Sequence, residues 1–123
     1  KKKILFNNSK DKISIKSVEV RHGRINCLAF IINDICAYAS DVNEIYKKDL
    51  KHFYNLEYFV VDCLRVNPHP SHFNLNEVLN LIEKIKPKKT ILTNLHSDLD
   101  YNYLLKILPK NVQPAYDGLS FYI

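Results

Sequence analysis

The sequence lacks several features that would place it in a common class. It has no methionine and no tryptophan, and its only two glycines, Gly23 and Gly118, lie far apart. Without a glycine-rich loop it carries neither a P-loop nor a dinucleotide-binding fingerprint. No apolar run is long enough to span a bilayer, and no signal peptide is visible. We therefore expect a cytoplasmic protein that does not act at a membrane.

The absence of methionine also bears on where the chain begins. A translated product needs an initiator, yet this sequence starts with three lysines, so we expect further residues upstream of Lys1. At 123 residues the chain suffices for one domain or for part of a larger one. Its hydrophobic fraction of 46% is enough for a core.

Cysteines are few and acidic residues are outnumbered by basic ones. Cys27, Cys36 and Cys63 lie in apolar runs without the C-x-x-C spacing of a metal site, which favours buried, reduced thiols. The net charge is +5, and positive charge attracts anionic partners at long range. Nucleic acid and a phosphorylated metabolite both fit this charge.

The first half of the sequence predicts mostly strands. The apolar phase changes near Ser17, which predicts a β-bulge. Residues 25–32 are apolar almost throughout, as in a strand buried on both faces, and Asn33-Asp34 predicts a tight turn after them. Residues 42–53 have the apolar spacing of a helix. Strands are expected over 4–6 (an edge strand or a frayed terminus), 13–20, 25–32 and 35–39.

The second half alternates strands with helices. Strands are expected over 58–61 and 89–93, each followed by an amphipathic helix. Asp117-Gly118 predicts the turn of a closing hairpin over 112–123. Two capping pairs predict where the helices begin: Asn74 with Glu77, and Ser97 with Asp100. The order predicts an α/β fold with a β-rich start, then β-α-β-α and a terminal β-hairpin.

Polar side chains able to bind a metal or move a proton follow several predicted strands. Open α/β sheets gather functional groups where strands end, so these side chains are candidates for one shared site. Imidazole and carboxylate together suit zinc, manganese or iron. Each residue also has a purely structural interpretation. Asp41, for example, is in position to cap the helix expected over 42–53 and to do nothing else. We assign His52 and His69 to the surface. The four candidates are His22, Asp41, His72 and His96.

A succession of short motifs runs through the chain from about Ile13 onward. In this order the motifs resemble the second half of a metallo-β-lactamase-fold hydrolase. They resemble in particular the PhnP-like cyclic phosphodiesterases of the carbon–phosphorus lyase pathway, which are similar to tRNA 3′-processing endonucleases. The motifs are Arg21-His22-Gly23, Tyr38-Ala39-Ser40-Asp41, Val61-Asp62-Cys63, His69-Pro70-Ser71-His72, Leu92-Thr93-Asn94 and Ala115-Tyr116-Asp117-Gly118.

The resemblance implies an αββα sandwich with two divalent metal ions, zinc or manganese. It implies that His22 binds one metal, that Asp41 bridges both, and that His72 assists proton transfer to the leaving group. The family's last ligand is a histidine directly after the Leu-Thr pair. Asn94 stands there in this sequence, and His96, two residues later, is the expected substitute.

The family's first-half signature, His-x-His-x-Asp-His, does not occur, and we expect it upstream of Lys1. Residues 1–123 would then be the C-terminal part of a single domain, whose N-terminal half is the missing partner. When complete, the protein is expected to hydrolyse a phosphodiester small molecule or nucleotide. This chain alone is expected to be inactive, with partial or no metal occupancy.

Two alternatives stay open. Half of a sandwich exposes apolar sheet surface, so the chain is alternatively an inactive module that forms a homodimer or pairs with another half. It is alternatively a basic RNA-binding fragment, which only the charge and the tRNA-processing relatives favour.

Overall fold

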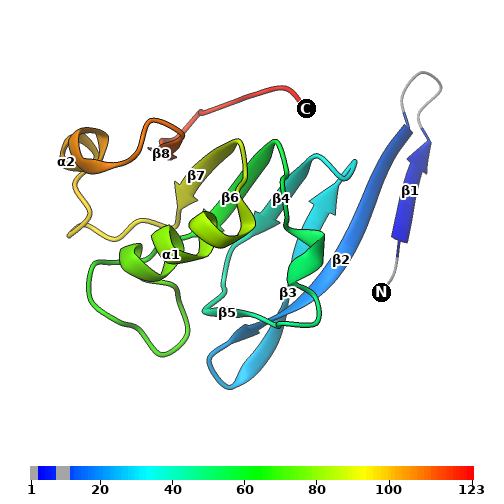
Figure 1. Cartoon of the computed structure of the whole chain (residues 1–123), viewed down its shortest axis with the longest axis horizontal. Helices are drawn as coiled ribbons and strands as arrows, with labels where there is room; N and C mark the ends of the chain where they lie inside the picture. The colour runs from blue at the N-terminus through cyan, green and yellow to red at the C-terminus, as the bar shows by residue number, and fades with distance from the viewer. Residues whose placement is uncertain (1–2, 8–11) are drawn as a thin grey trace.

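One mixed β-sheet runs through the molecule (Figure 1). The computed structural model describes residues 3–7 and 12–123, and within them the sheet has eight strands. The strands are β1 (Lys3–Asn7), β2 (Lys12–His22), β3 (Ile25–Ile32), β4 (Cys36–Ala39), β5 (Glu44–Ile45), β6 (Tyr58–Asp62), β7 (Lys89–Thr93) and β8 (Val112–Pro114). The helical segments are the 3-10 turn η1 (Leu50–His52), α1 (Leu75–Ile85) and α2 (Tyr101–Ile107).

The direction of the strands decides where their loops meet. Strands β1 to β4 form an antiparallel meander, and β4, β6, β7 and β8 run parallel. Because β2 and β4 are both antiparallel to β3, which lies between them, β2 points the same way as the parallel strands. The C-terminal ends of β2, β4, β6, β7 and β8 therefore lie along one edge, here called the carboxyl edge.

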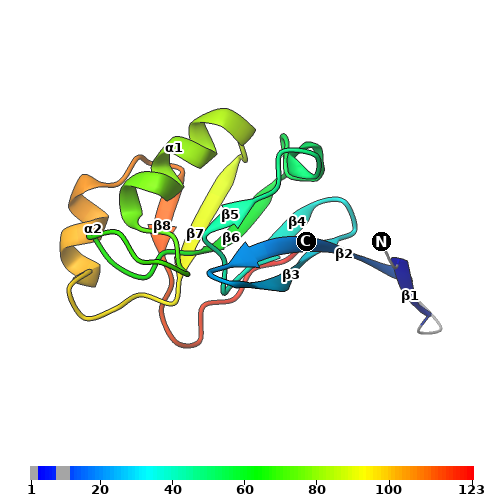
Figure 2. The same ribbon diagram turned by 90° about the horizontal axis from the view of Figure 1, so that it is seen from below.

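One face of the sheet is covered by the helices (Figure 2). Side chains alternate between the two faces of a strand, and on the covered face Val18, Val20, Phe59 and Val61 are fully buried. Helix α1 adds the buried side chains that recur along one of its faces. These are Val78, Ile82 and Ile85.

The other face of the sheet is open around Leu28, Phe30 and Tyr38, although Cys36 and Ile91 on the same face are buried, and this corrects two predictions. Phe30 and Leu28 are 38% and 53% exposed, so residues 25–32 are not buried on both faces. The register of β2 with β3 is unbroken from Ile15 to His22, so there is no bulge near Ser17. The change of apolar phase instead marks the point where apolar side chains switch from the open to the covered face.

Long-range contacts overturn the other wrong predictions. Residues 42–53 are not a helix, because Glu44 and Ile45 pair with β2 and only η1 is helical. Residues 119–123 form no strand, so the closing hairpin is absent. Instead, Phe121 stacks on Tyr58, with ring centroids 4.5 Å apart. Helix α2 is capped by Asp100 alone, which accepts from the Tyr103 N–H.

Local sequence signals are confirmed. Asn33 and Asp34 both take φ of 54° in the turn between β3 and β4. Asn74 and Glu77 form a reciprocal capping box at the start of α1. The predicted edge strand is β1, while residues 1–2 and 8–11 of that stretch lie outside the described residues. No helix in the described part of the chain has the length and apolar character needed to cross a membrane.

Candidate functional site

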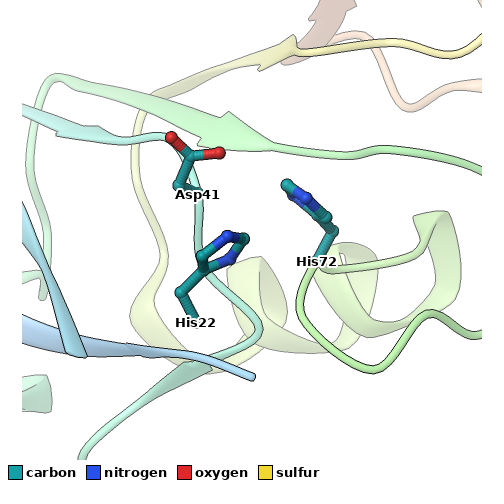
Figure 3. A group of neighbouring side chains, drawn as sticks. All are labelled: His22, Asp41 and His72. Atoms are coloured by element: carbon teal, nitrogen blue, oxygen red, sulfur yellow. The ribbon is translucent and has the colours of Figure 1, made fainter. Parts of the chain in front are cut away.

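Three of the four predicted side chains meet at the carboxyl edge. His22, Asp41 and His72 each offer one ligand atom, and these atoms all lie within 4.8 Å of one another. Figure 3 shows the three side chains gathered from separate segments of the chain. Both imidazoles are partly buried and the carboxylate is exposed, so the group opens to solvent on one side.

A crossing segment brings Asp41 from the end of β4 to the end of β2. Asp41 has a left-handed backbone, with φ of 50°, which turns the chain sharply after the strand. The Asn43 N–H then donates to the Arg21 carbonyl at 2.9 Å, and the Asn43 side chain accepts from the Gly23 N–H at 2.7 Å. Asp41 is thereby held beside His22, although β3 separates their strands in the sheet.

The imidazole of His22 is oriented by a backbone carbonyl. His22 Nδ1 lies 2.6 Å from the Ser71 carbonyl oxygen. A carbonyl oxygen only accepts, so Nδ1 carries a proton, and in the neutral ring Nε2 presents a lone pair. Histidines that bind metals are commonly fixed by a hydrogen bond of this kind on the other ring nitrogen.

His72 is oriented by a buried carboxylate to which the sequence alone assigns no role. Asp62 is 0% exposed, and its Oδ2 lies 2.5 Å from His72 Nδ1 and accepts from the Val42 N–H at 3.1 Å. Its Oδ1 accepts from Asn94 Nδ2 at 3.2 Å. Three donors therefore compensate the burial of this carboxylate. The sequence signals were an aspartate that ends a buried strand and its place in the Val61-Asp62-Cys63 motif.

His69 also lies at the site, whereas the sequence interpretation placed it at the surface. Its ring centroid is 5.0 Å from that of His72, which in turn is 4.7 Å from that of His22. The Ser71 N–H donates to His69 Nδ1, so in this hydrogen bond His69 is neutral with its proton on Nε2. Desolvation, followed by the nearby Arg65, lowers the pKa of His69 from its ordinary value.

His96 lies outside this group. Its side chain is 59% exposed, and Nδ1 is 3.3 Å from Asp98 Oδ1. Its backbone N–H donates to the Leu64 carbonyl at 2.8 Å, which fixes the loop but not the ring. The ligand role of His96 stays a prediction.

A cavity of about 520 Å³ adjoins the site. It lies between the loops that follow β7 and β8, and Asn94, which bonds to Asp62, is part of its lining. The remaining lining residues are Thr93, Leu95, Ala115, Tyr116, Asp117 and Gly118.

The three gathered side chains fit a divalent cation. Two imidazoles and one carboxylate are the donor set that zinc and manganese accept, and His22 and His72 are each held through Nδ1 with Nε2 free for coordination or proton transfer. One carboxylate and two imidazoles are fewer donors than two metal ions need.

Comparisons with known proteins place the fold. No protein-family model and no curated protein matches the chain. A solved structure of a new diphosphatase from the PhnP family matches it with a TM-score of 0.88 and 27% identity, over 97% of this chain and 46% of that chain.

Two further solved structures are similar at lower identity. Human tRNase Z, short form, has a TM-score of 0.70 and 12% identity, over 95% of this chain and 44% of that chain. YhfI from Bacillus subtilis, a metallo-β-lactamase fold protein, has a TM-score of 0.70 and 16% identity, over 94% of this chain and 51% of that chain. The chain thus spans about half the length of each of these structures.

Proposed function

We propose that this chain, which has a partial metallo-β-lactamase fold, supplies the C-terminal half of the active site of a metal-dependent phosphodiester hydrolase. One observation carries the proposal: His22, Asp41 and His72 come from three separate segments and place their ligand atoms within 4.8 Å of one another. The similarity to a PhnP-family diphosphatase supports the reaction class.

Each residue has a distinct part in the proposed site. His22 and Asp41 would hold divalent cations, zinc or manganese, together with ligands from an N-terminal half. Bound cations of this kind make water nucleophilic near neutral pH and offset charge on phosphorus. His96 would join as a ligand only if its ring turned away from Asp98.

His72 would give a proton to the leaving oxygen through Nε2. Asp62 accepts at Nδ1, which holds the ring in place and stabilises its protonated form. General acid catalysis of this kind contributes roughly 10²- to 10⁴-fold in rate. Asp62 is then a positioning residue that acts through His72.

Activity tests the proposal most directly. A chain extended upstream to include a His-x-His-x-Asp-His segment should cleave bis(4-nitrophenyl) phosphate when zinc or manganese is added. Asp41→Ala should abolish that activity almost completely, because it removes a carboxylate ligand. Asp34→Ala, at the turn after β3, is the matched control. Unchanged activity in the Asp41 variant would refute the site.

Metal affinity separates ligands from the proton donor. In competition with a chromophoric chelator, His22→Ala should weaken cation binding, whereas His72→Asn should leave binding within about twofold and reduce only turnover. If both variants lose the cation equally, His72 is a ligand and the proton donor lies elsewhere.

The open sheet face supports a proposal about the partner. Leu28, Phe30 and Tyr38 expose apolar surface there, as expected if a second layer packs on this face. We propose that the N-terminal half of the sandwich covers it, and that the chain alone forms a homodimer through it. Light scattering should then give a molar mass above that of the monomer. The Phe30→Lys variant should have a lower molar mass, because the charge disrupts the apolar face. The RNA-binding alternative rests only on the net charge and on the fold that the chain shares with human tRNase Z.

A further inference from the structure

His69 lies beside the proposed proton donor, but the proposed reaction gives it no role. Its side chain is partly buried, and its ring centroid is 5.0 Å from that of His72. The Ser71 N–H donates to His69 Nδ1 at 3.2 Å, and the Ser71 hydroxyl group lies 3.2 Å from the same nitrogen. Because a backbone N–H only donates, Nδ1 is an acceptor here, and the proton of the neutral ring is on Nε2.

The neighbouring imidazoles differ in the group that each one presents. His22 carries a proton on Nδ1, next to the Ser71 carbonyl oxygen, so in the neutral ring its Nε2 offers a lone pair to a cation. His69 has the opposite tautomer and presents an N–H group instead. Among residues 3–7 and 12–123, nothing accepts from this Nε2–H. A free N–H group is suited to the oxygen of an anion and not to a metal ion.

The loop that carries His69 is held before any substrate arrives. The Leu75 N–H donates to the Arg65 carbonyl at 3.0 Å, which closes the base of the loop. The Arg65 side chain donates to the carbonyl oxygens of Asn67 at 3.2 Å and Pro68 at 2.6 Å. The arginine therefore fixes the loop and places a positive charge near His69. A fixed donor near positive charge stabilises an anion without reorganisation.

A phosphate at the ligand group would lie within reach of this donor. The His72 ring contacts the His22 ring, at 4.7 Å between centroids, and also the His69 ring, at 5.0 Å. We propose that His69 Nε2–H donates to a non-bridging oxygen of the phosphate whose leaving oxygen meets His72. The inference rests on the proposed function for the place of the phosphate. It makes His69 a substrate-binding residue, in contrast to the metal ligand His22 and the proton donor His72.

The split between KM and kcat tests this role in the extended chain with zinc and bis(4-nitrophenyl) phosphate. His69→Phe keeps a ring but removes the donor. It should raise KM about tenfold and leave kcat within about twofold, because the bond to a charged oxygen is made before and during the reaction. His69→Gln restores an N–H group at a similar distance from the backbone, and its KM should stay within about threefold of the original. His72→Asn should lower kcat instead.

Two further measurements show that the effect belongs to the donor. In competition with a chromophoric chelator, His69→Phe should bind zinc within about twofold of the original chain, and a larger loss would make His69 a ligand and overturn the inference. In long-range ¹⁵N–¹H spectra of the metal-free chain at about pH 8, His69 should carry its proton on Nε2, and a proton on Nδ1 would also overturn it. His52→Phe, on η1, is the matched control.

Binding of inorganic phosphate separates this inference from the proposed function. In calorimetry on the zinc-loaded extended chain, His69→Phe should weaken phosphate binding about tenfold, whereas His52→Phe should not change it. Unchanged phosphate affinity in the His69→Phe variant would overturn the inference even if the extended chain hydrolyses the ester. Phosphate binding that depends on His69, in an extended chain without hydrolase activity, would keep the anion contact and refute the hydrolase.

Discussion

Two loops leave neighbouring parallel strands at the carboxyl edge, and a histidine of each loop contacts an aspartate. In the loop after β6, His72 meets Asp62, which is 0% exposed, at 2.5 Å. In the loop after β7, His96 meets Asp98, which is 40% exposed, at 3.3 Å. The first pair is tied to other segments through Val42 and Asn94, whereas the second lies at the surface, where Asp98 accepts only a 3.5 Å bond from the Val66 N–H of another segment.

The difference shows what holds a histidine ring in one orientation. A carboxylate orients an imidazole only if the carboxylate is itself fixed, and Asp62 is fixed because it ends a buried strand and accepts three hydrogen bonds. Asp98 is the same residue type, but it is 40% exposed and is held from another segment only by the Val66 N–H at 3.5 Å. Both histidines follow a strand, so their position does not distinguish them. Whether the partner carboxylate is buried decides whether the histidine ring is held in one orientation.

The largest expected effect is on stability. Asp62→Ala leaves three donors without their acceptor, and should lower the free energy of unfolding by about 3 kcal/mol. Asp98→Ala, the matched change in the exposed loop, should stay within about 0.5 kcal/mol. Urea denaturation measures both, and equal losses would show that the two loops do not differ.

A second prediction concerns the two histidines as ligands. His22→Ala should weaken zinc binding roughly 10- to 100-fold, as loss of a ligand or of its support does elsewhere. His96→Ala should change zinc binding less than threefold, because its ring lies outside the gathered group. Competition titration gives both constants. A comparable loss for His96 would mean that its loop moves to reach the cation.

The two glycines sharpen the comparison at the level of the backbone. Both have positive φ, but a Cβ at Gly23 would lie 3.0 Å from Ser71 Cβ, whereas nothing lies within 4 Å at Gly118. Gly23→Ala should therefore cost about 2 kcal/mol and Gly118→Ala about 1 kcal/mol. Thermal unfolding of the two variants tests the order.

The smallest expected effect is the pH dependence of stability. Desolvation lowers the pKa of His69 below its ordinary 6.5, so the unfolded chain binds this proton more readily than the folded one. The stability that His69 contributes is then fully present above pH 6.5 and is lost as the pH falls through its lowered pKa. His69→Gln should flatten the fall in urea midpoint between pH 7 and 5, and His96→Gln should not.

Signals that act within a few residues were enough for much of the fold. The Asn74–Glu77 capping box and the Asn33-Asp34 turn depend on neighbours in sequence, and both are confirmed. The predicted half of a metallo-β-lactamase fold is confirmed by the PhnP-family structure. The helix predicted over 42–53 is wrong because Glu44 pairs with Arg21 in the sheet, a contact that helical spacing does not reveal.

The same distinction between local signals and long-range contacts applies to the candidate site. His22, Asp41 and His72 were predictable because strand ends at one edge converge whatever their side chains do. The bond from Asn94 to Asp62 and the approach of His69 to His72 were not predictable, because both depend on where a side chain points after the loops have packed.

The left-handed backbone of Asp41 has a consequence for how this position tolerates change. Among charged residues, aspartate alone visits that conformation with little penalty, because its short side chain bonds locally. Glutamate would keep the charge but resist the turn, and asparagine would keep the turn but lose the charge. Conformation excludes glutamate and the loss of charge excludes asparagine, so a library of all substitutions at residue 41, selected for cation binding, should return mainly aspartate.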